Sequence, residues 1–340
     1  MPSPTDYFTP AEVDRHKYII EESNQRLYIK NSSGGCWANA DVIVFGNSEV
    51  CIFWQKNNQT VKYRELLLSL QWLERYARYG RLLMSYDSTT RAFRTYTGAD
   101  GITRKWVVEA NTELCRGGGA AYNGRSWLAI SQDSMNELLN TVTQSVPTMP
   151  QVIFYEMGRG LWDLKLDETL DWELDIPSRY GFWTLGFNGA MTVIAPEYLG
   201  VKMNYYGWDA AAFRTDRLND LNSYIRGRRY NFENTWCEYL LPWNTNQSVN
   251  DLMAGLVIYL YENYGREAFL HYLFALLKTQ PDNYPRSYRE RRAENLVRSA
   301  CIAAYWTQGA DRAAELHRYF YSTLRWTFLG STPMSLETSL

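Results

Sequence analysis

The sequence has 340 residues, 46% of them hydrophobic, so the chain can bury one large core or two cores of ordinary domain size. Its 35 basic and 37 acidic residues give a formal charge of -2, which provides no overall field to attract nucleic acid or an anionic membrane surface. Aromatic residues make up 15% of the chain, and most of these large rings are expected in the core. These numbers indicate a globular protein, and any binding of nucleic acid would require a local patch.

Targeting and redox signals are absent from the sequence pattern. Residues 1–20 contain no apolar run, and no later apolar stretch reaches the roughly 20 residues that a bilayer span requires. The cysteines stand singly, in odd number and without a CxxC pair, which indicates reduced thiols and not a disulfide framework or a zinc knuckle. They are Cys36, Cys51, Cys115, Cys237 and Cys301. We therefore expect a cytoplasmic protein with no signal peptide and no membrane span.

The first part of the chain carries strand patterns around one long helix. Residues 38–56 contain β-branched and aromatic runs interrupted at Gly46, the pattern of a strand pair. Residues 63–83 repeat apolar side chains at helical spacing and predict one amphipathic helix. Residues 93–111 are typical of a hairpin, and residues 125–131 are typical of a further strand.

From about residue 134 onward the predicted elements are helices. They cover residues 134–145, 150–164, 179–201, 250–265, 266–279, 291–309 and 311–326. A mixed half with a sheet followed by a helical half defines an α+β fold. We therefore expect an α+β region over residues 1–133 and a helical region over residues 134–340. Together they are expected to form one compact two-lobed unit with a ligand cleft between the lobes.

Two groups of residues resemble ligand-binding patterns, but a structural role explains each of them better. Residues 115–124 contain three consecutive glycines but lack the Lys-Ser/Thr of a P-loop, and a strand follows where a dinucleotide site needs a helix. We expect a loop before an edge strand there. His16, His271 and His317 are far apart in the sequence, and the last two lie among apolar helical residues. We expect packed, hydrogen-bonded histidines and no histidine-based zinc site.

Charged runs give no specific site. The acidic segment 162–180 offers oxygen ligands for calcium but lacks the DxDxDG spacing of a calcium loop, so a solvated loop is the favoured interpretation. Its carboxylates are Asp163, Asp167, Glu168, Asp171, Glu173 and Asp175. Residues 286–298 are basic, yet glutamates at helical spacing compensate the arginines and no aromatic platform for nucleic acid accompanies them.

Several stretches, taken in their order along the chain, carry a family resemblance. The long helix ending ERYARYGRLL, the glycine-rich loop leading into RSWLAIS and the helix VIFYEMGRGLW resemble successive elements of zincin-type metallopeptidases. Residues 250–277 and 293–306 look like the C-terminal helices of enhancin-like peptidases and plant basic secretory proteins. The resemblance covers roughly residues 60–328. It implies a zincin-like fold with a twisted sheet and long helix, an active-site-type helix and a helical C-terminal half.

In these peptidases the active-site helix carries HExxH, whose two histidines bind zinc on one helical face while the glutamate activates the metal-bound water. The matching stretch here is YEMGR, which retains Glu156 but places Tyr155 and Arg159 at the histidine positions. A third ligand, often a glutamate before Gly-Phe, would fall on Leu185. The resemblance therefore implies a zincin scaffold with replaced zinc ligands. No cofactor is predicted: zinc is not expected, and calcium has no specific support.

The chemistry of Arg159 limits the functions that the YEMGR stretch can have. Arg159 cannot bind zinc, because a guanidinium stays protonated and has no lone pair to give. It can instead pair with Glu156, three residues earlier on the same helix. In one interpretation this pair is a salt bridge that fills an abandoned metal site. In the other, Tyr155, Glu156 and Arg159 act as proton donor, carboxylate base and anion clamp, although a glutamate held by arginine is a poor base near neutrality.

We expect a zincin-like, non-proteolytic protein whose cleft binds a peptide, a glycan or a small molecule. One alternative is an active hydrolase or biosynthetic enzyme that uses Glu156 with Tyr155 and Arg159. Another is an interaction module that presents aromatic side chains such as Trp172 and Tyr180 to a partner protein.

Overall fold

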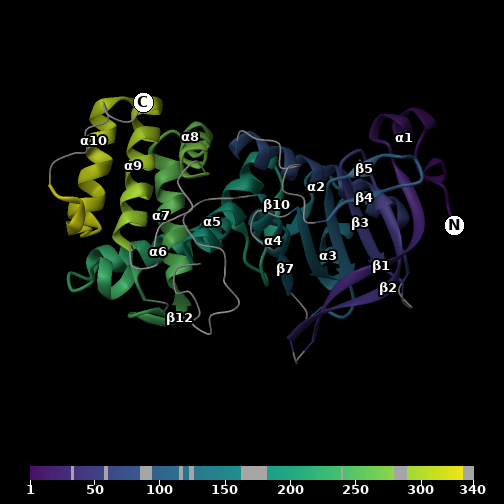
Figure 1. Ribbon diagram of the computed structural model, residues 1–340, viewed down its shortest axis with the longest axis horizontal. Helices are drawn as coiled ribbons and strands as arrows, with labels where there is room; N and C mark the ends of the chain where they lie inside the picture. Colours follow the sequence, from purple (N-terminus) through teal and green to yellow (C-terminus); the bar gives the residue numbers. More distant parts are fainter. Residues whose placement is uncertain are drawn as a thin grey trace. The chain divides into compact units, whose positions relative to one another are not determined.

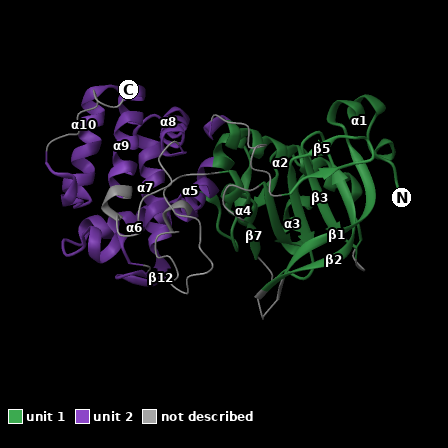
Figure 2. Ribbon diagram, in the orientation of Figure 1, with its two compact units in different colours: residues 1–81, 86–161, 195–210 green, residues 82–85, 162–194, 211–340 purple. Residues whose placement is uncertain are grey.

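The structure is a computed structural model that describes residues 1–31, 34–56, 60–84, 94–114, 118–121, 126–161, 182–238, 240–278 and 289–331. The chain forms two compact units, unit 1 with residues 1–81, 86–161 and 195–210, and unit 2 with residues 82–85, 162–194 and 211–340 (Figure 2). The predicted α+β class is confirmed, because unit 1 contains the main sheet and helices dominate unit 2 (Figure 1). The helix that carries YEMGR belongs to unit 1, with the sheet.

A six-stranded mixed sheet with the strand order β1-β2-β3-β6-β8-β7 forms the centre of unit 1. Its strands are β1 (Ile19–Asn31), β2 (Gly34–Gly46), β3 (Val50–Gln55), β6 (Trp106–Asn111), β7 (Gly119–Ala121) and β8 (Trp127–Ser131). Strand β2 is antiparallel to both β1 and β3, strands β3, β6 and β8 run parallel, and β7 is antiparallel to β8. The strands predicted over residues 38–56 and 125–131 are therefore confirmed.

The glycine-rich stretch corrects one expectation. Of residues 115–124 the structure describes 118–121, and residues 119–121 are not a loop but strand β7 at the edge of the sheet. Gly119 lies opposite Ile130, so β8, expected as the edge strand, is second from the edge. Glycine and alanine are weak strand formers, which hides this strand in the sequence. The small residues are needed because a helix packs closely on β7.

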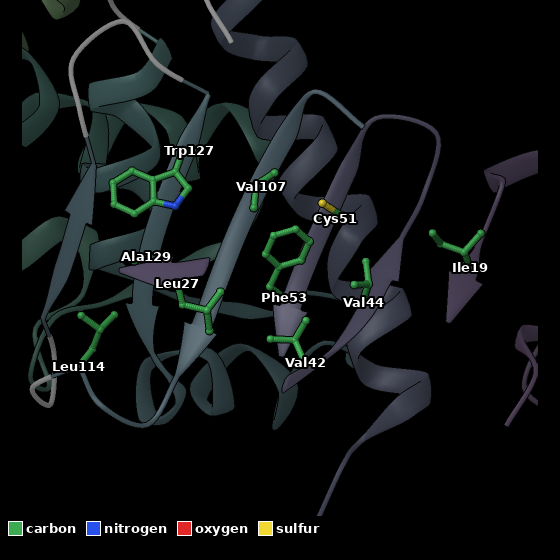
Figure 3. Close-up of a cluster of buried hydrophobic side chains, with 10 residues drawn as sticks. All are labelled: Ile19, Leu27, Val42, Val44, Cys51, Phe53, Val107, Leu114, Trp127 and Ala129. Carbon is green, nitrogen blue, oxygen red and sulfur yellow. The ribbon is translucent and has the colours of Figure 1, made fainter. Parts of the chain in front are cut away.

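The hairpin of β1 and β2 folds over one face of the sheet. Leu27 of β1 belongs to the same buried cluster as Trp127 of β8 (Figure 3). The backbone N–H of Tyr28 donates to Oε2 of Glu109 on β6 at 2.8 Å, and the ring of Trp37 lies 5.2 Å from that of Trp127. An apolar core therefore forms between the hairpin and the central strands, while helices line the opposite face (Figure 3).

Helices and short strands complete unit 1. They are α1 (Pro10–His16), α2 (Tyr63–Met84), α3 (Gln132–Leu139), α4 (Gln151–Leu161), β4 (Tyr96–Thr97), β5 (Thr103–Arg104), β9 (Thr148–Pro150) and β10 (Lys202–Asn204). The long helix and the hairpin predicted from the sequence are confirmed by α2 and by the antiparallel pair β4 and β5. Arg104 is fully buried, and its guanidinium donates to both carboxylate oxygens of Asp100 at 2.7 Å, which fixes the turn between these strands. Strands β9 and β10 form a separate parallel pair.

Unit 2 is mainly helical. Its elements include α5 (Phe182–Leu199), which ends in unit 1, and α6 (Ala210–Arg226), α7 (Val249–Asn263), α8 (Arg266–Lys278), α9 (Arg289–Gln308), α10 (Ala310–Arg318), β11 (Leu240–Leu241) and β12 (Asn244–Ser248). The sequence does not predict α6, because charged Arg217 and Asp220 are buried among its apolar residues and interrupt the helical pattern. Within the described part of the chain, no helix is both long and apolar enough to span a bilayer.

An aromatic cluster forms part of the core of unit 2. The rings of Trp236 and Trp326 lie 5.3 Å apart, and Phe232 packs edge-on against Trp326 at 5.1 Å. Next to this cluster, Arg325 donates to the carbonyl oxygen of Tyr224 at 2.6 Å and lies over the Tyr224 ring. The C-terminal segment is therefore tied to the last turn of α6, whose carbonyl groups have no partners within the helix.

Candidate functional site

Helix α4 carries the predicted site residues and packs tightly against α2. The hydroxyl of Tyr76 on α2 donates to the carbonyl oxygen of Phe154 at 2.8 Å, and the two rings meet edge-on at 5.2 Å. One turn further along α2, a Cβ at Gly80 would come within 2.5 Å of Leu161. Close packing of Leu161 against Gly80 and the Tyr76 hydrogen bond therefore hold α4 against α2 in unit 1.

The other side of α4 packs on the edge strand. A Cβ at Gly119 of β7 would lie 2.6 Å from Cγ of Glu156 and 2.7 Å from Cγ2 of Val152. Only glycine leaves room for this approach. The methylene stem of Glu156 is therefore held between α4 and the strand, which limits the positions that its carboxylate can take.

A single polar face of α4 remains accessible. Gln151, Tyr155 and Arg159 are partly exposed, whereas the other residues of the helix are buried. Because these three residues are spaced by four, they lie one above another on one face of the helix. We call them the polar stripe. A ligand that contacts α4 would meet an amide, a phenol and a guanidinium there.

The structure brings Glu156 and Arg159 together, as the spacing predicts. Nη1 of Arg159 donates to Oε2 of Glu156 at 3.1 Å. The glutamate side chain is 9% exposed and the arginine side chain 20% exposed. A carboxylate so deeply buried needs a compensating charge, and the guanidinium supplies it. Tyr155 lies on the polar stripe, one turn before Arg159.

The chemistry of this arrangement is that of a charge-neutral binding surface. The Arg159 guanidinium keeps a fixed positive charge and can bind a carboxylate or phosphate in a planar, two-donor geometry. The Tyr155 hydroxyl can donate or accept a hydrogen bond. The carboxylate of Glu156 is already engaged, because it accepts a hydrogen bond from Arg159.

The predicted third-ligand position falls on helix α5. Leu185 is a partly exposed residue of α5 in the section assigned to unit 2, and its side chain has no metal-binding atom. In the same stretch Asn188 is fully buried, and neither atom of its amide group has a hydrogen-bond partner in the described structure. Such an amide marks a position that a water or a polar ligand atom would stabilise. Trp172, Tyr180 and the acidic segment 162–180 lie outside the described residues.

Two of the three histidines contact neighbouring groups of the protein. Nδ1 of His271 lies 2.9 Å from the carbonyl oxygen of Leu82, and the ring of His16 stacks on Tyr18 at 5.2 Å. His317 corrects the expectation of hydrogen-bonded histidines, because it is buried and neither ring nitrogen has a partner among the described residues. Burial lowers the pKa of His317 and so favours the neutral ring. In the described ranges, no group of three or more His, Cys, Asp or Glu side chains is placed to hold a metal ion.

The sequence did not reveal a second polar cluster, which lies in unit 2. Nη1 of Arg217 is 2.6 Å from Oδ1 of Asp251 on α7 and 3.7 Å from Oδ2 of Asp220. Burial raises the pKa of Asp220 to about 7, although Arg217 opposes this shift. No sequence signal points to this cluster, because α6 has no regular apolar stripe. Gln151, in contrast, could have been found from its spacing of four residues from Tyr155.

Comparison of the sequence with known protein families finds no match, and a search among curated proteins also finds none. Among solved structures, the chain is similar to a protein from Bacillus anthracis str. Ames described as a functionally unknown conserved protein mutant. The two share 9% sequence identity with a TM-score of 0.45, over 94% of this chain and 72% of the other. That likeness is too low to assign a fold family.

Proposed function

We propose that this protein is a zincin-like, non-proteolytic binding protein. In this proposal the Glu156–Arg159 ion pair takes the place of a zinc site, and the polar stripe of α4 contacts the ligand. The observation that carries the proposal is the ion pair itself, with 3.1 Å between Nη1 of Arg159 and Oε2 of Glu156. A peptidase needs its glutamate to accept a proton from a metal-bound water, and here that carboxylate is paired with a fixed cation.

The residue types on the stripe support binding over hydrolysis. Neither a guanidinium nor a phenol at the two former histidine positions provides the neutral nitrogen ligand that zinc prefers. Both groups are hydrogen-bond donors that suit a polar ligand. We propose a peptide, a glycan or a small molecule as the ligand, with an acidic group of that ligand contacting Arg159.

An assay for peptide hydrolysis tests the proposal. The purified full chain is incubated with a mixed peptide library, with and without added zinc, and products are detected by mass spectrometry. The variant Glu156→Gln is compared with Asp133→Asn, a control at an exposed acidic position on α3. We expect no cleavage by any of the three proteins.

Ligand binding is tested in parallel by a thermal-shift screen of acidic peptides, oligosaccharides and small carboxylates. For a ligand that stabilises the natural protein, the Arg159→Gln variant should bind at least tenfold more weakly. A tenfold loss corresponds to roughly one charge-assisted hydrogen bond. The opposite result is that the natural protein and the Asp133→Asn variant both cleave peptides, whereas the Glu156→Gln variant does not and keeps the melting temperature of the natural protein. That outcome would assign an active hydrolase instead.

A further inference from the structure

Residues 205–208 form a tight aromatic turn at the end of β10. The backbone N–H of Tyr205 donates to the carbonyl oxygen of Trp208 at 2.8 Å, and the N–H of Trp208 donates back to Tyr205 at 2.9 Å. Tyr206 and Gly207, between them, have φ of +50° and +91°. Positive φ at both central positions is the signature of a type I′ turn, the tightest hairpin connection. We call residues 205–208 the aromatic tip.

The tip is held in one conformation. The N–H of Gly207 donates to Oδ1 of Asn204 at 3.0 Å, and Asn204 pairs with Pro150 of β9. Tyr206 occupies the left-handed region, which is unfavourable for a residue with a large side chain. Asparagine or glycine would fit this position with less strain, so the backbone gives no reason for a tyrosine here. We therefore attribute the presence of tyrosine at position 206 to its aromatic ring.

The aromatic rings of the tip face solvent. Tyr206 is 69% exposed, Trp208 44% and Tyr205 38%, and a Cβ built on Gly207 meets no atom of the described residues within 4 Å. From these fractions the exposed area of the three side chains is about 300 to 400 Å². The largest exposed apolar patch on a folded protein is of about this size and is often functional, so the tip is a candidate site of contact with another molecule.

We infer that the aromatic tip inserts into the interfacial region of a lipid bilayer. Its rings are tyrosine and tryptophan, which combine an apolar body with a polar edge and concentrate at the boundary between headgroups and acyl chains. A protruding two-residue turn can enter that boundary without bringing the polar body of the protein with it. The tip would anchor the protein peripherally, independently of the α4 site.

A protein partner is the less favoured occupant. Stable protein interfaces bury at least about 1,000 Å² in total, and the three rings of the tip supply only a fraction of that area. Two charged residues that flank the tip, Lys202 and Asp209, are exposed. A membrane interface, in contrast, needs only the depth of a few side chains.

The charges beside the tip predict which lipids it binds. Exposed Lys202 is opposed by Asp209 and by Glu137, whose Oε2 accepts a hydrogen bond from Asn204 at 3.4 Å. This mixed charge gives no attraction to anionic headgroups. Zwitterionic lipid should therefore be sufficient, and binding should depend little on salt.

Flotation with phosphatidylcholine vesicles tests the inference on the full chain. The double variant Tyr206→Asn, Trp208→Ser removes two rings while keeping residues suited to a turn. The control is Trp306→Ser on α9, which removes a tryptophan of similar exposure, 40%, from unit 2. Circular dichroism and melting temperature establish that each variant folds.

We expect the natural protein to float with the vesicles and the double variant to lose at least tenfold in its partition coefficient, with the control unchanged within twofold. Adding phosphatidylserine or raising the salt concentration should change the natural protein's partition less than threefold. The inference is overturned if the natural protein does not float, or if the double variant floats equally well. It is also overturned if binding requires phosphatidylserine, or if the protein forms a dimer that the double variant abolishes, which would assign the tip to a second copy of the chain.

Discussion

Breaking the Glu156–Arg159 ion pair should lower the stability of unit 1 more than breaking an ordinary surface ion pair would. Arg159→Met removes the guanidinium that lies 3.1 Å from a carboxylate whose side chain is only 9% exposed, and we expect a loss of about 3 kcal/mol in the opening free energy of unit 1. Glu156→Gln removes the carboxylate charge beside the guanidinium, whose side chain is more exposed at 20%, and should lower the same free energy by about 2 kcal/mol. The double variant removes both charges and should cost about 3 kcal/mol, not the sum of 5. The expected coupling energy is therefore about 2 kcal/mol.

Native-state hydrogen exchange of the α4 amides measures these energies locally, which matters because a chain of two compact units need not unfold in a single step. The matched control is the pair Arg312–Glu315 on α10, which has the same spacing but side chains 35% and 48% exposed. Its coupling should not exceed about 0.5 kcal/mol. Additive effects at Glu156 and Arg159, with no more coupling than in the control, would refute the argument that burial makes this pair strong.

Three further predictions concern packing and charge. Gly119→Ala should destabilise unit 1 by about 1 to 3 kcal/mol, because its Cβ would meet Glu156, and amide exchange in β7 and α4 should speed up together. Since the pKa of Asp220 is raised to about 7, the folded protein holds an extra proton between about pH 4 and pH 7. The unfolding free energy of unit 2 should therefore fall by at most about 4 kcal/mol as the pH rises through this range, and Asp220→Asn should flatten that dependence in a series of urea titrations. Arg325→Ala should destabilise unit 2 by about 2 kcal/mol, because the carbonyl groups at the end of α6 lose a charged donor, and calorimetry should show a lower melting temperature for that unit.

Elements with a regular pattern could be predicted from the sequence. Helix α2 repeats apolar residues at helical spacing over its whole length, and the pattern of residues 38–56 indicates β2 and β3. Helix α6 and strand β7 could not be predicted, because tertiary packing determines them. Arg217 of α6 is buried beside Asp251 of another helix, and Gly119 of β7 pairs with Ile130 of β8 while α4 packs on it.

The candidate site, too, could be predicted from the sequence only in part. The spacing of Glu156 and Arg159 was sufficient to predict their contact, because residues three apart on a helix are neighbours. The burial of the carboxylate was not predictable, since it depends on β7, a strand that the sequence conceals. The aromatic tip was also missed: a single Gly207 follows two tyrosines, and nothing in those letters says that Tyr206 adopts a positive φ.

The most direct test of the central claim is the zinc content of the purified full-length chain, measured by inductively coupled plasma mass spectrometry after growth in zinc-supplemented medium. With Tyr155 and Arg159 at the positions that the proposed zincin resemblance assigns to the zinc-binding histidines, we predict less than about 0.1 equivalents of zinc and no change in melting temperature on treatment with a chelator. One equivalent of zinc that a chelator removes, together with a fall in melting temperature, would contradict the account.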